Sequence, residues 1–243
     1  MSPYRTGSVR PAKVCFLCGA PVVSDGSREH FVPRCFYDGG RLPSERGLTL
    51  LAHRKCNGST AEDEQWVATN LALSNPMGWR DRSHWDRAIR TLAKPEASGM
   101  RSRIIDDAAE VPGGMLLPLG TRRVVWVIAK IVKGLCYRDR GILLGPDTEW
   151  SVRWGNYQDF IASDASYFAE VPAKGDISQR GSVLLAKGDG LRETRYCNWQ
   201  LVIRGQHVFF VTAVPRVKLG ALDGPNDCLR LVWPKRRQTD GDE

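Results

Sequence analysis

The chain has 243 residues, of which 42% are hydrophobic, so it can bury a sizeable core as one large or two small domains. Its formal net charge of +8 favours a polyanionic partner, most often nucleic acid, but it equally fits a charge that only maintains solubility. No stretch approaches the roughly 18 continuous apolar residues of a membrane span, and the first residues have no apolar signal segment. Three of the seven cysteines, Cys136, Cys197 and Cys228, are scattered without a framework pattern, which together with the missing signal segment indicates a reducing cytoplasm and not secretion.

The N-terminal segment 14–77 is rich in metal-ligand residues and follows a polar stretch, 1–13, that we expect to be a flexible lead-in. It predicts, in order, a zinc knuckle at 15–19, a strand at 29–32, a turn-rich loop at 38–44, a strand at 48–51, and a helix that starts after residue 56 and ends at 75–76. Asp63 and Glu64 fall in the first turns of that helix, where the helix dipole favours acid. We prefer this role for them to that of extra metal ligands.

A basic block follows within 78–110, which we interpret as a basic helix and a linker. Its tryptophans and aliphatic residues recur at roughly helical spacing, and Lys94-Pro95 ends the run. The arginine-rich side of this helix either is a solvated face or contacts phosphates. The candidate nucleic-acid contacts are Arg80, Arg87, Arg90 and Lys94.

The remainder, 111–234, is predicted to form a mixed α/β accessory domain, followed by a disordered tail at 235–243. After two arginines, a run that is apolar nearly all round apart from Lys130 and Lys133 predicts a buried helix at 122–137, although its β-branched residues also permit a strand. Further predicted elements are a helix at 156–168, strands at 183–186, 196–203 and 207–214 with a hairpin between the last two, and an edge strand at 228–233. The expected fold class is therefore α+β.

Four residues of the N-terminal segment have the spacing of a structural zinc site. Cys15 and Cys18 form one pair, and His53 and Cys56 form the other, so that two knuckles each give two ligands to one tetrahedral Zn²⁺. Ordinary buried thiols are the alternative for the cysteines, and His53 could instead serve a second site. We interpret Cys35 as an apolar filler and assign no function to two further histidines, His84 and His207.

Glu29 and His30 stand between these pairs, and Asn57 follows the last cysteine. Hydrolysis of a phosphodiester needs a base that activates water, for which a histidine with a near-neutral pKa is suited. A hard cation such as Mg²⁺ polarises the phosphate and prefers oxygen ligands, which a carboxylate and an amide carbonyl supply. Adjacent residues on a strand point to opposite faces, so Glu29 and His30 serve one site only if the strand is twisted or bent there, or if His30 acts from across the scissile phosphate. His30 could also be a histidine without catalysis, and Asn57 also suits a helix N-cap.

Together these motifs resemble the zinc-containing branch of the HNH endonucleases, also called the ββα-metal fold. The resemblance covers about residues 14–75 and rests on Cys15-x-x-Cys18, Glu29-His30-x-x-Pro33, Leu48-Thr-Leu-Leu51 and His53-x-x-Cys56-Asn57. It implies a zinc-stapled, treble-clef-like module in which base and carboxylate share one site. In that module His30 would be the general base, and Glu29 and Asn57 would hold a catalytic Mg²⁺ or Mn²⁺. Cys15, Cys18, His53 and Cys56 would hold the structural Zn²⁺.

The chain departs from the family pattern at three places. Glu29 stands where the family usually has Asp, and His53 stands where it often has Cys; both replacements keep the ligand chemistry. No asparagine between His30 and Asn57 corresponds to the family's central Asn, which supports the loop after the base.

The function we expect is a metal-dependent DNA endonuclease, acting on double-stranded DNA and leaving 5′-phosphate and 3′-hydroxyl ends. One setting for it is a bacterial or phage defence or restriction system, with the C-terminal region available to a protein partner. The alternative is a non-catalytic zinc-binding nucleic-acid-binding protein, or a regulatory subunit of a larger nuclease complex. The joint presence of Glu29, His30 and Asn57 favours the nuclease, because a binding module needs none of the three.

Overall fold

The computed structural model describes residues 13–37, 49–74, 82–111, 114–116, 121–156, 184–191, 196–203 and 207–215. They form a mixed α+β structure, which confirms the expected fold class. Several predictions fall outside the described residues: the lead-in at 1–12, the loop at 38–44, Arg80, nearly all of the helix at 156–168, the strand at 228–233 and the tail at 235–243.

The N-terminal part contains a strand pair followed by two helices. β1 (Gly26–His30) pairs antiparallel with β2 (Thr49–His53), and a short 3-10 turn, η1 (Arg34–Phe36), lies between them in the sequence. After β2 come α1 (Arg54–Gly58) and α2 (Ala61–Leu73). The predicted order of strand, strand and helix is therefore confirmed.

The first strand is displaced from its predicted position at 29–32. Phe31 and Val32 are both fully buried, and a strand would direct two successive side chains to opposite faces. The chain instead bends after His30, so that both side chains enter the core. The apolar Phe-Val pair therefore marks the end of the strand and not its centre.

The basic block forms two helices and not one. α3 (Arg82–Leu92) ends before Lys94-Pro95 as predicted, and Pro95 starts the 3-10 turn η4 (Pro95–Ala97). A second helix, α4 (Ser98–Asp107), and a hairpin of β3 (Ala109–Val111) and β4 (Gly114–Leu116) then occupy the expected linker.

The C-terminal part consists of one long helix and one antiparallel sheet. The helix is α5 (Thr121–Arg140), which confirms the helix predicted at 122–137. The sheet has the order β5-β8-β7-β6, with β5 (Thr148–Asn156), β6 (Leu184–Leu191), β7 (Tyr196–Ile203) and β8 (His207–Pro215). The predicted hairpin is β7–β8, whereas β5 is an additional strand.

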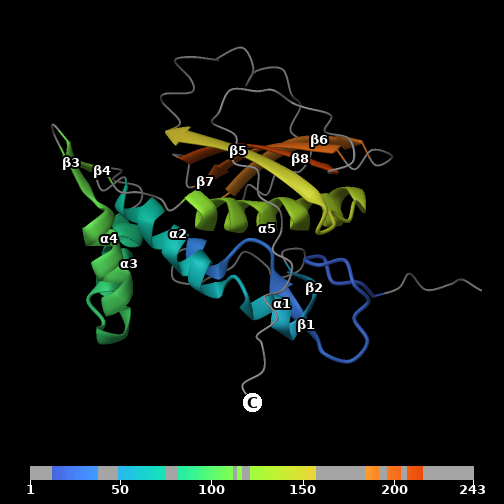
Figure 1. Ribbon diagram of the computed structural model, residues 1–243, viewed down its shortest axis with the longest axis horizontal. Helices are drawn as coiled ribbons and strands as arrows, with labels where there is room; N and C mark the ends of the chain where they lie inside the picture. The colour runs from blue at the N-terminus through green and yellow to red at the C-terminus, as the bar shows by residue number, and fades with distance from the viewer. Residues whose placement is uncertain are drawn as a thin grey trace, which may run out of the picture.

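Helix α5 lies between the sheet and the N-terminal part of the molecule (Figure 1). This central position explains its sequence, because a helix that is apolar on all sides must be buried on all sides. One cluster of buried apolar side chains runs from Phe16 and Phe31 through α2 and α5 to β5, β7 and β8. The core is thus continuous across the predicted boundary between nuclease module and accessory domain.

Among the described residues, no helix combines the length and the apolar character needed to cross a membrane.

Candidate metal centre and adjoining pocket

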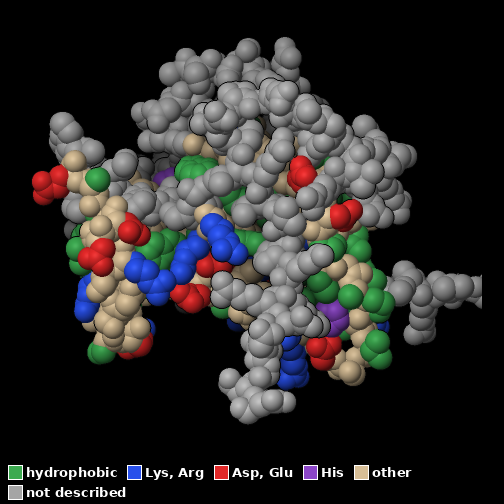
Figure 2. Space-filling model, in the orientation of Figure 1, with side chains coloured by type: hydrophobic (Ala, Val, Ile, Leu, Met, Phe, Trp, Pro, Cys, Tyr) green, Lys and Arg blue, Asp and Glu red, His purple; other side chains and the backbone are tan. Residues whose placement is uncertain are grey.

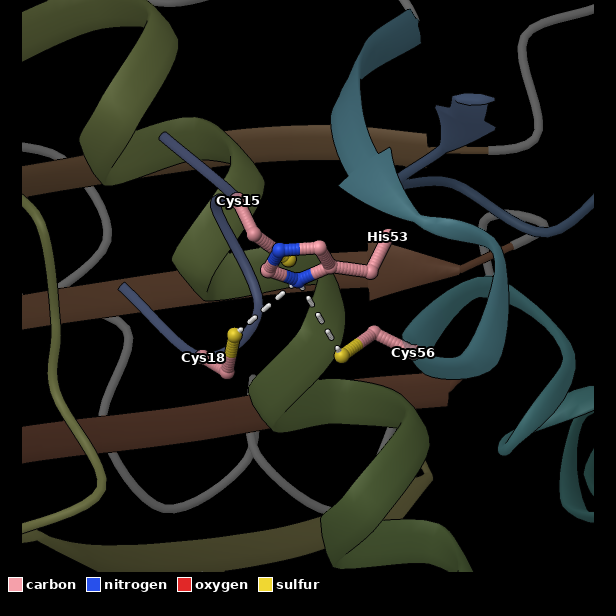
Figure 3. Close-up of side chains that lie close together, drawn as sticks. All are labelled: Cys15, Cys18, His53 and Cys56. Atoms are coloured by element: carbon pink, nitrogen blue, oxygen red, sulfur yellow. Dashed lines mark hydrogen bonds between the residues drawn. The ribbon is translucent and has the colours of Figure 1, made fainter. Parts of the chain in front are cut away.

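Four side chains converge at one end of the β1–β2 pair. Cys15 and Cys18 come from the loop before β1, His53 is the last residue of β2, and Cys56 lies in α1. One ligand atom from each side chain lies within 4.8 Å of the others, and Figure 3 shows the four side chains directed toward one another. The two pairs predicted from spacing therefore meet, and the group can hold one metal ion.

The backbone around Cys15 and Cys18 forms a tight knuckle. The amide of Cys15 donates to the Ala20 carbonyl at 2.9 Å, and the amide of Gly19 donates to the Cys15 carbonyl at 2.8 Å. Gly19 has a φ of +80°, a left-handed conformation that a side chain would strain. This turn brings the two thiols, three residues apart, to the same side of the loop.

The two ring nitrogens of His53 have separate partners. Nε2 lies 3.0 Å from the Pro21 carbonyl, which only accepts, so Nε2 carries the proton. Nδ1 then carries the lone pair, and it faces Cys18 Sγ at 3.4 Å and Cys56 Sγ at 3.9 Å. Ligand atoms around tetrahedral zinc are separated by about 3.8 Å, so this spacing suits Zn²⁺. A backbone acceptor on the second nitrogen is the usual way to orient a zinc-ligating imidazole.

The pKa values of two thiols in the group, Cys15 and Cys56, are shifted in opposite directions. Burial, together with the neighbouring Cys15 and Cys18, raises the pKa of Cys56 to about 12. Burial also acts against ionisation of Cys15, but hydrogen bonds from the backbone amides of Cys18 and His53 outweigh it and lower the pKa of that thiol. A bound Zn²⁺ would stabilise the thiolate form of all three cysteines.

A separate pocket of about 610 Å³ is lined by Glu29, His30 and Asn57, the last of which directly follows Cys56 in the chain. Its other lining residues are Arg28, Arg34, Thr49 and Glu64. Glu29 and His30 reach one pocket although they are neighbours in sequence, because β1 ends at His30 and the chain bends there. The three residues that sequence reasoning grouped by chemistry are therefore grouped in space.

Asn57 connects α1 to β1 and is not a helix cap. The N-cap position of α1 is His53 and that of α2 is Thr60. The amide nitrogen of Asn57 donates to Ser27 Oγ at 3.1 Å and approaches the Arg28 carbonyl at 3.5 Å. With the nitrogen held by β1, the carbonyl oxygen Oδ1 is the atom of this side chain that can bind a cation.

Glu29 has a partner that the sequence motif does not include. Its carboxylate is buried, and its Oε1 accepts a hydrogen bond from the Lys130 ammonium, which α5 brings to the pocket. The same ammonium also donates to Glu64 Oε1. Burial raises the pKa of Glu29, and the positive charge of Lys130 acts in the opposite direction.

Lys130 is the site residue that sequence reasoning missed, whereas Glu64 was considered as an extra metal ligand and set aside in favour of a role at the start of the helix. A signal for Lys130 is present, because a lysine inside an otherwise apolar helix needs a buried counter-charge. Glu64 gives no such signal, since its position in the first turn of α2 already accounts for an acidic residue. Only the packing of α5 against α2 and β1 places the three groups together.

The candidate contacts in the basic block separate into two kinds. The Arg87 guanidinium donates to the Tyr37 carbonyl at 2.9 Å, so this side chain connects α3 to the N-terminal part. Arg90 and Lys94 are exposed, and all three line a second cavity of about 510 Å³ with Glu96. Figure 2 shows basic and acidic side chains interspersed over α2, α3 and α4 and not a uniformly basic face.

The other polar side chains that the sequence analysis named lie outside the metal centre. Cys35 Sγ donates to the Glu64 carbonyl at 3.4 Å, and Nε2 of His207 lies 3.0 Å from the Leu71 carbonyl. His84 is buried in α3. Within the described ranges, no second set of three cysteine, histidine or acidic side chains comes as close together as the Cys₃His group.

Comparison of the chain with protein-family models, with curated proteins and with solved structures finds no match. The geometry of its own residues is therefore what carries a functional assignment.

Proposed function

We propose that the chain is a metal-dependent DNA endonuclease whose N-terminal segment is a zinc-stapled ββα-metal module of the HNH type. The observation that carries the proposal is that Glu29, His30 and Asn57 line one pocket, and that Asn57 directly follows Cys56 of the Cys₃His group. The order of the supporting elements, two antiparallel strands and then a helix, is the order that the ββα-metal fold requires. Zinc at the Cys₃His group would fix the ends of β2 and α1, and hence Asn57.

The pocket provides the groups that hydrolysis of a phosphodiester needs. His30 is half-buried at its wall and is the base that takes a proton from the attacking water. Arg28 and Arg34 line the same pocket and supply positive charge for the phosphate. Glu29 places a carboxylate next to the base in the chain. The amide of Asn57 is held in position by its hydrogen bond to Ser27 of β1.

The oxygen atoms of the pocket fit a hard divalent cation. Mg²⁺ commonly binds to one or two carboxylates and keeps several waters, so Glu29 with the Oδ1 atom of Asn57 is a sufficient protein contribution. When bound, such a cation supplies Lewis-acid stabilisation of charge on the phosphate and on the leaving oxygen. No cysteine or free thiol lines this pocket among the described residues, which matches the oxygen preference of Mg²⁺ and Mn²⁺.

The proposal is tested by incubating the zinc-loaded protein with supercoiled plasmid and Mg²⁺ or Mn²⁺. We expect nicked or linear products with 5′-phosphate ends that a ligase can reseal. Addition of EDTA should stop the reaction. Plasmid that stays supercoiled at every metal concentration, with zinc still bound, would contradict the proposal.

The second candidate is a non-catalytic zinc-binding protein that binds nucleic acid or regulates a larger nuclease. The pairing of Glu29 with Lys130 favours this candidate, because the carboxylate already has a cationic partner within the protein. DNA binding without cleavage, unaffected by Glu29→Gln, would support it over the nuclease.

A further inference from the structure

Lys130 is the most deeply buried charged group near the pocket. Its side chain has 0% exposure, and it lies in the middle of α5, about a hundred residues after Glu29 in the sequence. A buried ammonium is stable only when it is paired, and Lys130 is paired twice, with Glu29 of β1 and with Glu64 of α2. Three elements thus meet at this one group.

Each of the two carboxylates accepts hydrogen bonds from the protein at one of its oxygen atoms, Oε1. Glu29 Oε1 accepts from Lys130, while Glu64 Oε1 accepts from Lys130 and from the Thr60 hydroxyl at 2.6 Å. The Oε2 atom of each residue has no hydrogen bond to the described part of the chain. Both residues line the 610 Å³ pocket together with Asn57.

The formal charge of this group is set by Lys130. Two carboxylates carry −2, and the ammonium reduces the total to −1. A divalent cation in the pocket is attracted by the two carboxylates and repelled by the ammonium that holds them, as it is by Arg28 and Arg34 of the pocket lining. Because all three groups are largely shielded from solvent, these interactions are screened less than at the surface.

We propose that Lys130 is a positioning residue that holds Glu29 and Glu64 at the pocket and weakens the affinity of that pocket for a divalent cation. Glu64 is a further carboxylate of the same site. The inference rests on the proposed function, since it concerns the cation that the nuclease would use. It also means that α5, from outside the nuclease module, completes the site.

The test is Mn²⁺ binding to the full zinc-loaded chain, followed by the electron paramagnetic resonance signal of free Mn²⁺. This measurement does not depend on DNA cleavage. Lys130→Met keeps the length of the side chain and removes its charge, and we expect it to bind Mn²⁺ at least tenfold more tightly than the wild type. Glu64→Gln should bind it at least tenfold more weakly.

Lys133→Met is the matched control. Lys133 lies one turn further along α5, is equally buried, and donates to the Leu17 carbonyl at 2.6 Å instead of to the pocket carboxylates. Its substitution should leave Mn²⁺ affinity unchanged. If Lys130→Met does not fold, Glu64→Gln is compared with Glu64→Gln/Lys130→Met, in which only one pocket carboxylate remains. Removal of Lys130 should again tighten binding at least tenfold.

The outcomes separate this inference from the proposed function. Tighter Mn²⁺ binding without Lys130 supports the inference, even if the wild type cuts no DNA, in which case only the nuclease assignment fails. Unchanged or weaker binding without Lys130 overturns it. The inference is also overturned if the wild-type chain cleaves DNA with Mg²⁺ while Glu64→Gln leaves its Mn²⁺ affinity unchanged. That result would mean that Mn²⁺ does not bind at this pocket.

Discussion

At the scale of single residues, the metal centre depends on which cysteines lie in it and not on how many the chain has. Cys56 contributes its thiol to the Cys₃His group, whereas Cys35, equally half-buried, bonds to a backbone carbonyl elsewhere. The spacing of the four ligands was sufficient to predict the group, because two short knuckles leave few arrangements open. The tautomer of His53 was not predictable, since it depends on the Pro21 carbonyl, 32 residues away in the sequence.

The first prediction concerns these two cysteines. Cys56→Ala should abolish stoichiometric zinc binding, because three ligands hold the ion less firmly than four. It should also lower the melting temperature strongly, because zinc binds to the folded state and not to the unfolded chain, and so stabilises the fold. Cys35→Ala should retain one zinc per chain. Elemental analysis of both purified variants provides the measurement, and equal zinc content in the two would contradict the assignment.

A second prediction separates Arg87 from Arg90. Arg90→Ala should reduce the slope of log affinity for DNA against log salt by about 0.9, the value of one lost phosphate contact on duplex DNA. Arg87→Ala should mainly lower stability, because it leaves the Tyr37 carbonyl without its donor. Binding titrations at several salt concentrations, with thermal melts alongside, decide this. If only Arg87→Ala changed the salt slope, Arg87 and not Arg90 would be the phosphate contact.

At the scale of elements, α5 was predictable and its role was not. A long run that is apolar on nearly all sides indicates a buried helix, and residues 124–136 form one with only Lys130 and Lys133 interrupting it. The partners of its two lysines were not predictable. Lys130 pairs with Glu29, and Lys133 donates to the Leu17 carbonyl, and both partners lie over a hundred residues away in the sequence. β5 was missed although Trp150, Val152 and Trp154 alternate with polar residues, which is the pattern of a half-buried strand.

The third prediction concerns the packing of α5 against the N-terminal part. A Cβ at Gly134 would overlap the ring of Phe31, so Gly134→Ala should destabilise the fold by about 1–3 kcal/mol despite the better helix propensity of alanine. Gly99 in α4 has open space around it, and Gly99→Ala should be neutral or stabilising by up to about 1 kcal/mol. Denaturant unfolding of the two variants gives both values. A Gly134→Ala variant as stable as wild type would mean that the two parts do not pack as described.

At the scale of the whole molecule, the N-terminal part and the C-terminal part share one hydrophobic core. Phe16, Phe31 and Trp66 are buried in the same cluster as Ile128 and Trp199. Sequence reasoning placed a boundary near residue 77 because the motifs end there. The extent of a motif does not show whether the segment that carries it packs against the rest of the chain. The division of the chain into these two functional regions remains a prediction.

The fourth prediction follows from that shared core. A fragment of residues 1–116 lacks α5 and the sheet, so it exposes the apolar side chains that pack on them. We expect it to aggregate or to unfold without cooperativity even with zinc added. A soluble fragment with one bound zinc and a cooperative melt would show instead that the N-terminal part folds independently.

The most direct measurement of the central claim is plasmid cleavage by His30→Ala beside His207→Ala. His30 lines the pocket, and His207 bonds to a backbone carbonyl outside it. With zinc content and melting behaviour matched, we predict a loss of at least a hundredfold in cleavage rate for His30→Ala, in the range of a lost general base. His207→Ala should cut at close to the wild-type rate. Equal cleavage by His30→Ala and wild type would contradict the account.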